Sequence, residues 1–97
     1  MKDDGLLRAQ IRFHKALSNP ERLRIVHTLL DGEMSQCEIF PKMGLAQSTV
    51  SSYLSQLVRA GLLDVRRDGQ KKMYSISDKA IKDLLQEIRT TISNGNT

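Results

Sequence analysis

The amino-acid sequence predicts a mainly α-helical domain that carries one small β-hairpin. Three observations indicate this fold class. Apolar residues recur at intervals of three and four along most of the chain, which is the period of amphipathic helices. Two strand-like runs flank Asp68-Gly69-Gln70, and Asp-Gly between such runs is typical of a hairpin turn. The length of 97 residues favours one domain over residues 1–97, with about five helices and a two- or three-stranded sheet.

The first two predicted helices meet at a sharp boundary. The first ends near Ser18, and Asn19-Pro20 starts the second, because Asn caps free helix amides and proline at the first helical position needs no donor. The second helix stops at Asp31-Gly32. The apolar stripes of the two helices contain Leu6, Leu7, Ile11, Phe13, His14 and Leu17, and then Leu23, Ile25, Val26, Leu29 and Leu30.

A third, short helix is predicted to start at Ser35. Ser35 and Glu38 have the spacing of a capping box, in which each side chain bonds the backbone amide of the other residue. Pro41 removes an amide and Gly44 favours a turn, so we expect only a turn or two of helix. A short strand at Glu33-Met34 would be able to pair with the hairpin.

The fourth predicted helix, from Gln47 to Arg59, has two contrasting faces and ends before Gly61. The strands Leu62–Arg67 and Lys71–Ile76 follow, and Ser77 or Asp78 then caps a last helix. Residues 93–97 form a frayed tail in this interpretation. The apolar stripe of the fourth helix contains Val50, Tyr53, Leu54, Leu57 and Val58, and that of the last contains Ile81, Leu84, Leu85, Ile88 and Ile92.

This order of elements is typical of a winged helix-turn-helix, in which the fourth helix enters the major groove of DNA and the hairpin forms the wing. Short hydroxyl side chains let a helix approach base edges closely, and serine on four positions of one face is unusual for a helix. An ordinary solvated face is the alternative interpretation. The residues we expect to contact DNA from this helix are Gln47, Ser48, Thr49, Ser51, Ser52 and Ser55.

Positive charge is concentrated in the hairpin. The chain holds 15 Lys and Arg against 11 Asp and Glu, a net charge of +4, and four of the basic residues lie between positions 66 and 72. A tight turn would bring Arg66, Arg67, Lys71 and Lys72 together, where they could meet a phosphate backbone or a minor groove. Basic residues also protect the edges of hairpins, so solvation alone is again the alternative.

Other classes of function fit the sequence less well. We expect no enzyme, since no catalytic set, phosphate-binding glycine loop or metal cluster can be assembled. A winged helix that binds other proteins without contacting DNA is the alternative function, although such a surface would expose apolar or aromatic residues. No run approaches the length of a membrane span, and we expect a cytoplasmic protein. A chain this small with no disulfide would gain stability from a second copy.

Three ordered motifs, FHKALSNPERLRIVHTLL, LAQSTVSSYLSQLVRAGLL and DVRRDGQKKMYSIS, resemble the ArsR/SmtB family of repressors over roughly residues 10 to 90. The resemblance implies a winged-helix dimer that represses transcription from a partly palindromic operator until an inducer releases it. It also implies that the positions of Gln47, Ser48, Ser51 and Ser52 face DNA, although many relatives carry His or Arg at the position of Ser52. Dimer contacts through the first and last helices would involve Leu6, Leu7, Ile81, Leu84, Leu85, Ile88 and Ile92.

The metal sites of that family are not expected here. Relatives that sense arsenic or cadmium carry two cysteines in the stretch matching Glu33 to Ile39, where this chain has only Cys37, and a soft-metal site needs more than one thiolate. Zinc-sensing relatives bind through the last helix, and counting from Asp78 gives Ala80, Thr91 and Asn94 at the ligand positions. His14 and His27 lack any ligand spacing. We therefore expect no metal and no cofactor, with Cys37 either a redox switch or an inert small residue.

Overall fold

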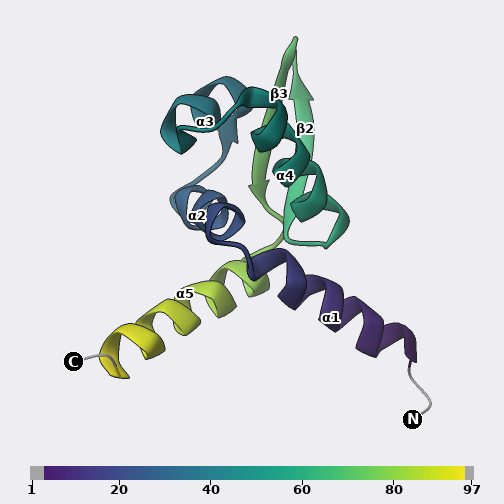
Figure 1. Cartoon of the computed structure of the whole chain (residues 1–97), viewed down its shortest axis with the longest axis vertical. Helices are drawn as coiled ribbons and strands as arrows, with labels where there is room; N and C mark the ends of the chain where they lie inside the picture. The colour runs from purple at the N-terminus through teal and green to yellow at the C-terminus, as the bar shows by residue number, and fades with distance from the viewer. Residues whose placement is uncertain (1–3, 96–97) are drawn as a thin grey trace.

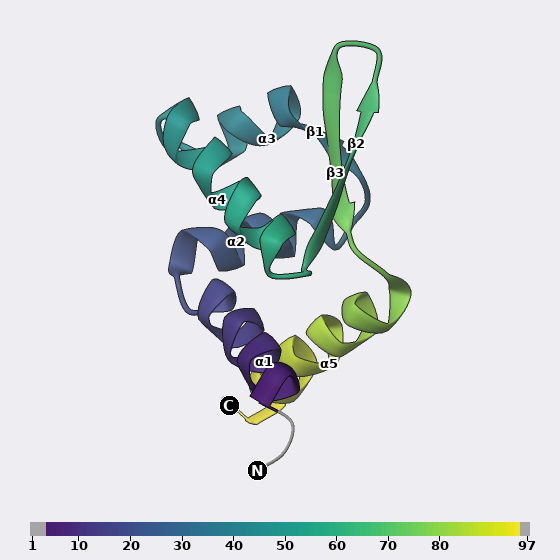
Figure 2. The same cartoon turned by 90° about the vertical axis from the view of Figure 1, so that its right-hand side faces the viewer.

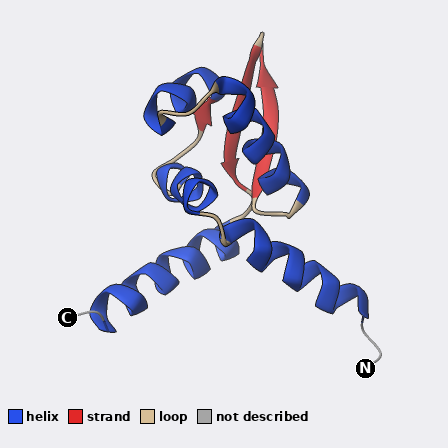
Figure 3. Ribbon diagram, in the orientation of Figure 1, coloured by secondary structure: helices blue, strands red, loops and turns tan. Residues whose placement is uncertain are grey.

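The computed structural model describes residues 4–95 and confirms a mainly helical fold with a small sheet. Helices two to four gather beside the hairpin and form the body of the molecule, while the first and last helices diverge below it (Figure 1, Figure 3). Among residues 4–95, none of the helices combines the length and the hydropathy that a membrane-spanning segment needs. The elements are α1 (Asp4–Leu17), α2 (Pro20–Leu29), β1 (Met34–Ser35), α3 (Gln36–Met43), α4 (Gln47–Arg59), β2 (Leu63–Asp68), β3 (Lys71–Ile76) and α5 (Lys79–Gly95).

The starts of α2, α3 and α5 are fixed by side-chain caps at the predicted positions. Asn19 Oδ1 accepts a hydrogen bond of 2.9 Å from the Arg22 amide at the start of α2. Ser35 and Glu38 form the full capping box of α3, with bonds of 3.2 Å and 2.9 Å to each other's amides. At α5 the cap is Asp78, whose Oδ1 accepts a 2.8 Å bond from the Ile81 amide. These bonds satisfy helix amides that would otherwise lack partners.

Helix α3 has the short length that the sequence predicts. It contains 8 residues, about two turns, and Pro41 lies inside it without ending it. Gly44 ends the helix in the left-handed region at φ 66°, where a residue with a β-carbon would be strained. The turn that follows sets α4 against α3, which is the arrangement of a helix-turn-helix.

The sheet has three strands in the order β1-β3-β2, all antiparallel. The short strand beside the hairpin is Met34–Ser35, one residue later than predicted, and it pairs with Met73 and Tyr74 of β3. In the hairpin, Gly69 has φ 64° at the two-residue turn, as tight hairpin turns require. The register places Val65 opposite Tyr74 and Arg67 opposite Lys72.

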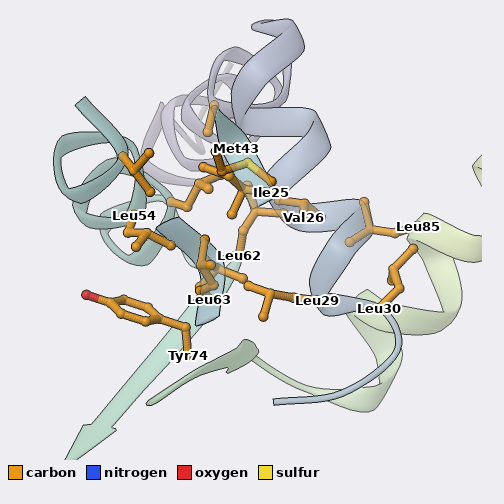
Figure 4. Packing of buried hydrophobic residues seen from close by; sticks show 14 residues of the cluster. Ile25, Val26, Leu29, Leu30, Met43, Leu54, Leu62, Leu63, Tyr74 and Leu85 are labelled. Atoms are coloured by element: carbon orange, nitrogen blue, oxygen red, sulfur yellow. The ribbon is translucent and has the colours of Figure 1, made fainter. Parts of the chain in front are cut away.

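The hydrophobic core lies between α2, α3, α4 and the base of the hairpin (Figure 4). In the apolar stripe of α4, Val50, Leu54 and Leu57 are buried, and Tyr53 and Val58 are half-buried against them. Leu62 and Leu63 close the core at the start of β2. Leu85 of α5, a predicted contact with a second copy, is only 3% exposed and packs beside Leu29 and Leu30 (Figure 4). This side chain therefore belongs to the core of its own chain rather than to the exposed apolar side of α5.

Helices α1 and α5 extend away from the body at the end opposite the hairpin tip, and two perpendicular views agree on this (Figure 1, Figure 2). Helix α5 continues through Gly95, so residues 93–95 are helical, contrary to the predicted frayed tail, whose last two residues lie outside the described range. Both helices expose one apolar side. The large exposed apolar residues on them are Leu6, Leu7, Ile11, Leu84, Ile88 and Ile92.

Candidate nucleic-acid interface

The polar face of α4 points out of the molecule. Ser48, Ser52, Ser55 and Arg59 are exposed, and their spacing of three and four places them in one row along the helix. The opposite side is buried in the core. Arg59 at the last turn is the only cation on α4, so most of this face is made of short, uncharged side chains. A helix with such a face can lie close to base edges.

Two glutamines hold serine hydroxyls of α4 in place. Gln36 of α3 donates a hydrogen bond of 2.8 Å from Nε2 to Ser51 Oγ, and Gln56 donates a longer one of 3.3 Å to Ser52 Oγ. Ser51 is half-buried because it lies toward α3. With its oxygen accepting from Gln36, the hydroxyl of Ser51 keeps its own hydrogen to donate. The sequence places Gln36 at the start of α3 but gives no signal that it meets α4.

The first turn of α4 has amides without a side-chain cap. Ala46 occupies the cap position and makes no side-chain hydrogen bond, unlike the caps of α2 and α3. Gln47 and Ser48 of this turn are exposed, and Thr49 is half-buried. Free amides at a helix start, together with the positive end of the helix dipole, attract phosphate.

The register of the hairpin divides the four basic residues between the two faces of the sheet. Arg67 and Lys72 lie directly opposite each other and share a face with Val65 and the buried Tyr74. Arg66 and Lys71 belong to the reverse face, because side chains alternate along a strand. On that face Lys71 contributes to lowering the pKa of Glu38, an effect that comes first from hydrogen bonds with Ser35. The four cations therefore form two pairs rather than one cluster.

Arg66 is not a free cation of the wing. Its Nη2 and Nε donate hydrogen bonds of 2.6 Å and 2.8 Å to the two carboxylate oxygens of Glu33, a bidentate ion pair between the loop before β1 and strand β2. These bonds lower the pKa of Glu33 and raise that of Arg66. The prediction that Arg66 contacts DNA has to account for this partner, since Glu33 already occupies the fork of the guanidinium.

A hollow of about 390 Å³ separates α4 from the wing. Helix α4 lines it with Ser55, Val58 and Arg59. The hairpin contributes Arg67 and Lys72, together with Val65, Tyr74 and part of Arg66. Ser55 and Arg59, the last two residues of the serine row of α4, therefore border one concave surface with the Arg67–Lys72 pair. This arrangement combines close-fitting polar groups with positive charge, which suits a polyanion whose bases are also within reach.

The remaining candidate residues lie away from this surface or form no site of their own. Cys37 is exposed on α3 and lines a shallow hollow with Phe40 and Gln47. His14 is exposed on α1, and burial and the charge of Arg89 lower the pKa of His27. Within residues 4–95, no three His, Cys, Asp or Glu side chains come together in a way that could hold a metal ion.

The fold and this surface define a winged helix-turn-helix transcription regulator that binds DNA. Comparison with known proteins gives the same class. The profile described as bacterial regulatory protein, arsR family, matches residues 19–65. The solution structure of a homodimeric winged helix-turn-helix DNA-binding domain from Mycobacterium bovis superposes with a TM-score of 0.89 at 29% identity, covering 95% of this chain and 85% of that one.

Two relatives in sequence agree with this result. A probable mercury resistance operon repressor of Streptomyces lividans is 40% identical over 80% of this chain, but the match spans only 62% of that protein. A helix-turn-helix-type transcriptional regulator of Mycobacterium tuberculosis is 34% identical over 96% of this chain and 82% of its own length. The chain belongs to the arsR family of bacterial regulatory proteins, a family of transcription regulators rather than enzymes.

Proposed function

We propose that this regulator is a repressor that binds a partly palindromic operator as a homodimer, with α4 reading bases and the wing holding the backbone. The concave surface that the end of the serine row, Ser55 and Arg59, shares with the Arg67–Lys72 pair carries the proposal. Two relatives are named as operon repressors, of mercury and of arsenical resistance, which supports repression as the mode of regulation. A symmetric dimer would present two such surfaces to two half-sites.

The residues divide into two roles in this proposal. Gln47, Ser48, Ser51 and Ser52 select sequence through close contacts in the major groove, with Ser55 further along the exposed row and Thr49 half-buried in the first turn. Arg67, Lys72 and Lys71 bind phosphates and supply most of the affinity. Arg66 acts as a structural cation that holds the wing to the loop before β1.

The dimer is proposed from the exposed apolar sides of α1 and α5. An open, apolar hollow of about 460 Å³ lies between the end of α1, α2 and α5, with Leu17, Leu23, Ile88 and Ile92 in its lining. Further exposed apolar residues lie along both helices, and large exposed apolar patches are rare on a monomer. The related domain from Mycobacterium bovis is described as homodimeric. A second copy would cover Leu6, Leu7, Leu84, Ile88 and Ile92, with Ile81 half-buried at the edge.

A salt titration tests the DNA-binding roles. The probe is a duplex that the protein selects from a random-sequence pool. The logarithm of the binding constant should fall linearly with the logarithm of salt concentration, with a slope of about −0.9 for each phosphate contacted. Arg67→Ala and Lys72→Ala should each reduce the magnitude of this slope by about one contact. Lys42→Ala, on the exposed end of α3, serves as a control that removes the same charge elsewhere.

A flat salt response of the unmodified protein would contradict the proposed interface and favour the alternative of a protein-binding winged helix. An equal change of slope in Lys42→Ala would show that net charge, rather than the wing, governs the affinity.

A further inference from the structure

A second basic hollow, separate from the wing, lies on the other side of α4. Its volume is about 210 Å³, and four cationic side chains line it: Arg12 and Lys15 of α1, Arg22 of α2 and Arg59 of α4. Ala16, Gln56 and Ala60 complete the lining, so no carboxylate takes part. Within residues 4–95, none of the four cations forms an ion pair. The hollow is therefore a concentrated positive surface with no carboxylate in its lining.

Arg22 fixes the shape of this hollow. Its Nε donates a 2.8 Å hydrogen bond to the Ala16 carbonyl, and its Nη2 donates a 3.1 Å bond to the Lys15 carbonyl at the end of α1. The same guanidinium lies over the ring of Tyr53, 5.4 Å from its centroid, on α4. One side chain therefore joins α1, α2 and α4, and it holds the end of α1, which carries Arg12 and Lys15, beside α4.

The two basic surfaces flank the serine row of α4. Ser55 and Val58 turn toward the wing, whereas Gln56 and Ala60 line the second hollow. Arg59 lines both hollows, so it lies between them at the end of the serine row. Positive charge is thus present on either side of the helix that is proposed to enter the groove.

This arrangement matches the geometry of a major groove, which is about 12 Å wide and is bounded by a phosphate backbone on each side. A helix lying in the groove meets one backbone along each flank. The wing supplies cations on one flank, and the α1–α2 hollow supplies them on the other. We propose that Arg12, Lys15 and Arg59 bind backbone phosphates of the operator on the flank of α4 opposite the wing. This inference rests on the proposed role of α4 as the DNA-reading helix.

The test compares the salt dependence of duplex binding by the intact protein and by the double variant Arg12→Gln, Lys15→Gln. The probe is again a duplex selected from a random-sequence pool. Losing two phosphate contacts should lower the magnitude of the slope by about 1.8, at about 0.9 for each contact. Between about 50 mM and 200 mM salt, the double variant should then lose roughly 12-fold less affinity than the intact protein loses. Lys79→Gln removes an exposed charge on α5 and should leave the slope unchanged.

Arg12 and Lys15 lie on the helix that is also proposed to dimerise, so sedimentation of each variant accompanies the titration. Arg59→Gln on α4 provides a second variant that does not touch α1, and it should lower the slope by about one contact. An unchanged slope in both variants, with the wing variants still showing a reduced slope, would overturn the second phosphate site and leave the proposed function intact. No salt-dependent binding by the intact protein would overturn both.

A free phosphate ion is the alternative ligand for the cations of this hollow, because it has the same chemistry as a DNA backbone phosphate. Thermal unfolding in millimolar inorganic phosphate, compared with chloride at equal ionic strength, separates the two sources. A rise in Tm that the double variant loses, together with an unchanged salt slope, would identify a small-anion site and overturn the DNA contact. No effect of phosphate on Tm, together with the reduced slope, supports the DNA backbone as the ligand.

Discussion

The ion pair between Glu33 and Arg66 changes the role that can be assigned to Arg66. In the sequence, Arg66 is one of four equivalent cations in a short basic run. In the structure its guanidinium is held by both carboxylate oxygens of Glu33, which lies 33 positions earlier in the chain. No local pattern connects these two residues, because the β1 loop and β2 are brought together only by the fold.

Replacing the carboxylate should free this cation for DNA. In Glu33→Gln, Arg66 loses its charged partner, so duplex binding should tighten and the salt slope should steepen by about one contact. The measurement is the salt titration of binding to a selected duplex. Asp31→Asn changes net charge equally in the same exposed loop and makes no ion pair among the described residues. If both variants show the same shift, net charge explains the effect and Glu33 has no specific role.

At the level of helices and strands, the sequence predicts several helix ends correctly, because these ends depend on local side chains. Asn19, the Ser35–Glu38 pair and Gly44 mark helix ends in the sequence because their side chains or backbone freedom act on neighbouring residues. The α4 helix has the predicted bounds for a similar reason. What the sequence could not supply is long-range: the partner of Gln36, the second basic hollow, and the burial of Leu85 all depend on how elements pack together.

The capping box should matter measurably for stability. Ser35 is buried and accepts the Glu38 amide, so Ser35→Ala leaves that amide without a partner and should lower the free energy of unfolding by about 1 kcal/mol. Urea denaturation measures the change. Ser48→Ala, at an exposed position in the first turn of α4, is the matched control and should change stability by less than about 0.5 kcal/mol. Equal effects of the two substitutions would argue against a capping role for Ser35.

For the whole molecule, the apolar sides of α1 and α5 predict self-association. Leu84 is 50% exposed on α5, so a charge at this position should oppose burial against a second copy while disturbing the core of the single chain little. Leu84→Asp should therefore sediment as a monomer at concentrations where the unmodified protein is a dimer. Thr90→Asp places the same charge on the opposite side of α5 and should remain dimeric. A dimeric Leu84→Asp would contradict this interface.

His27 should make stability depend on pH. Burial, followed by the charge of Arg89, lowers the pKa of His27 in the folded chain below its ordinary value of 6.5. The unfolded chain therefore binds a proton at higher pH than the folded chain does, and stability falls as pH is lowered through 6.5 toward the folded value. Urea denaturation between about pH 8 and pH 5 measures this dependence. It should flatten in His27→Gln, while His14→Gln, at an exposed position, should retain it.

The divergence of α1 and α5 has a quantitative consequence for regulation. Because their apolar sides are completed only by a second copy in the proposed dimer, the population of operator-binding species follows mass action. At chain concentrations below the dimer dissociation constant, that population rises with the square of the amount of protein. Occupancy of the operator would then respond more steeply than linearly to synthesis or degradation of the chain, without any bound effector.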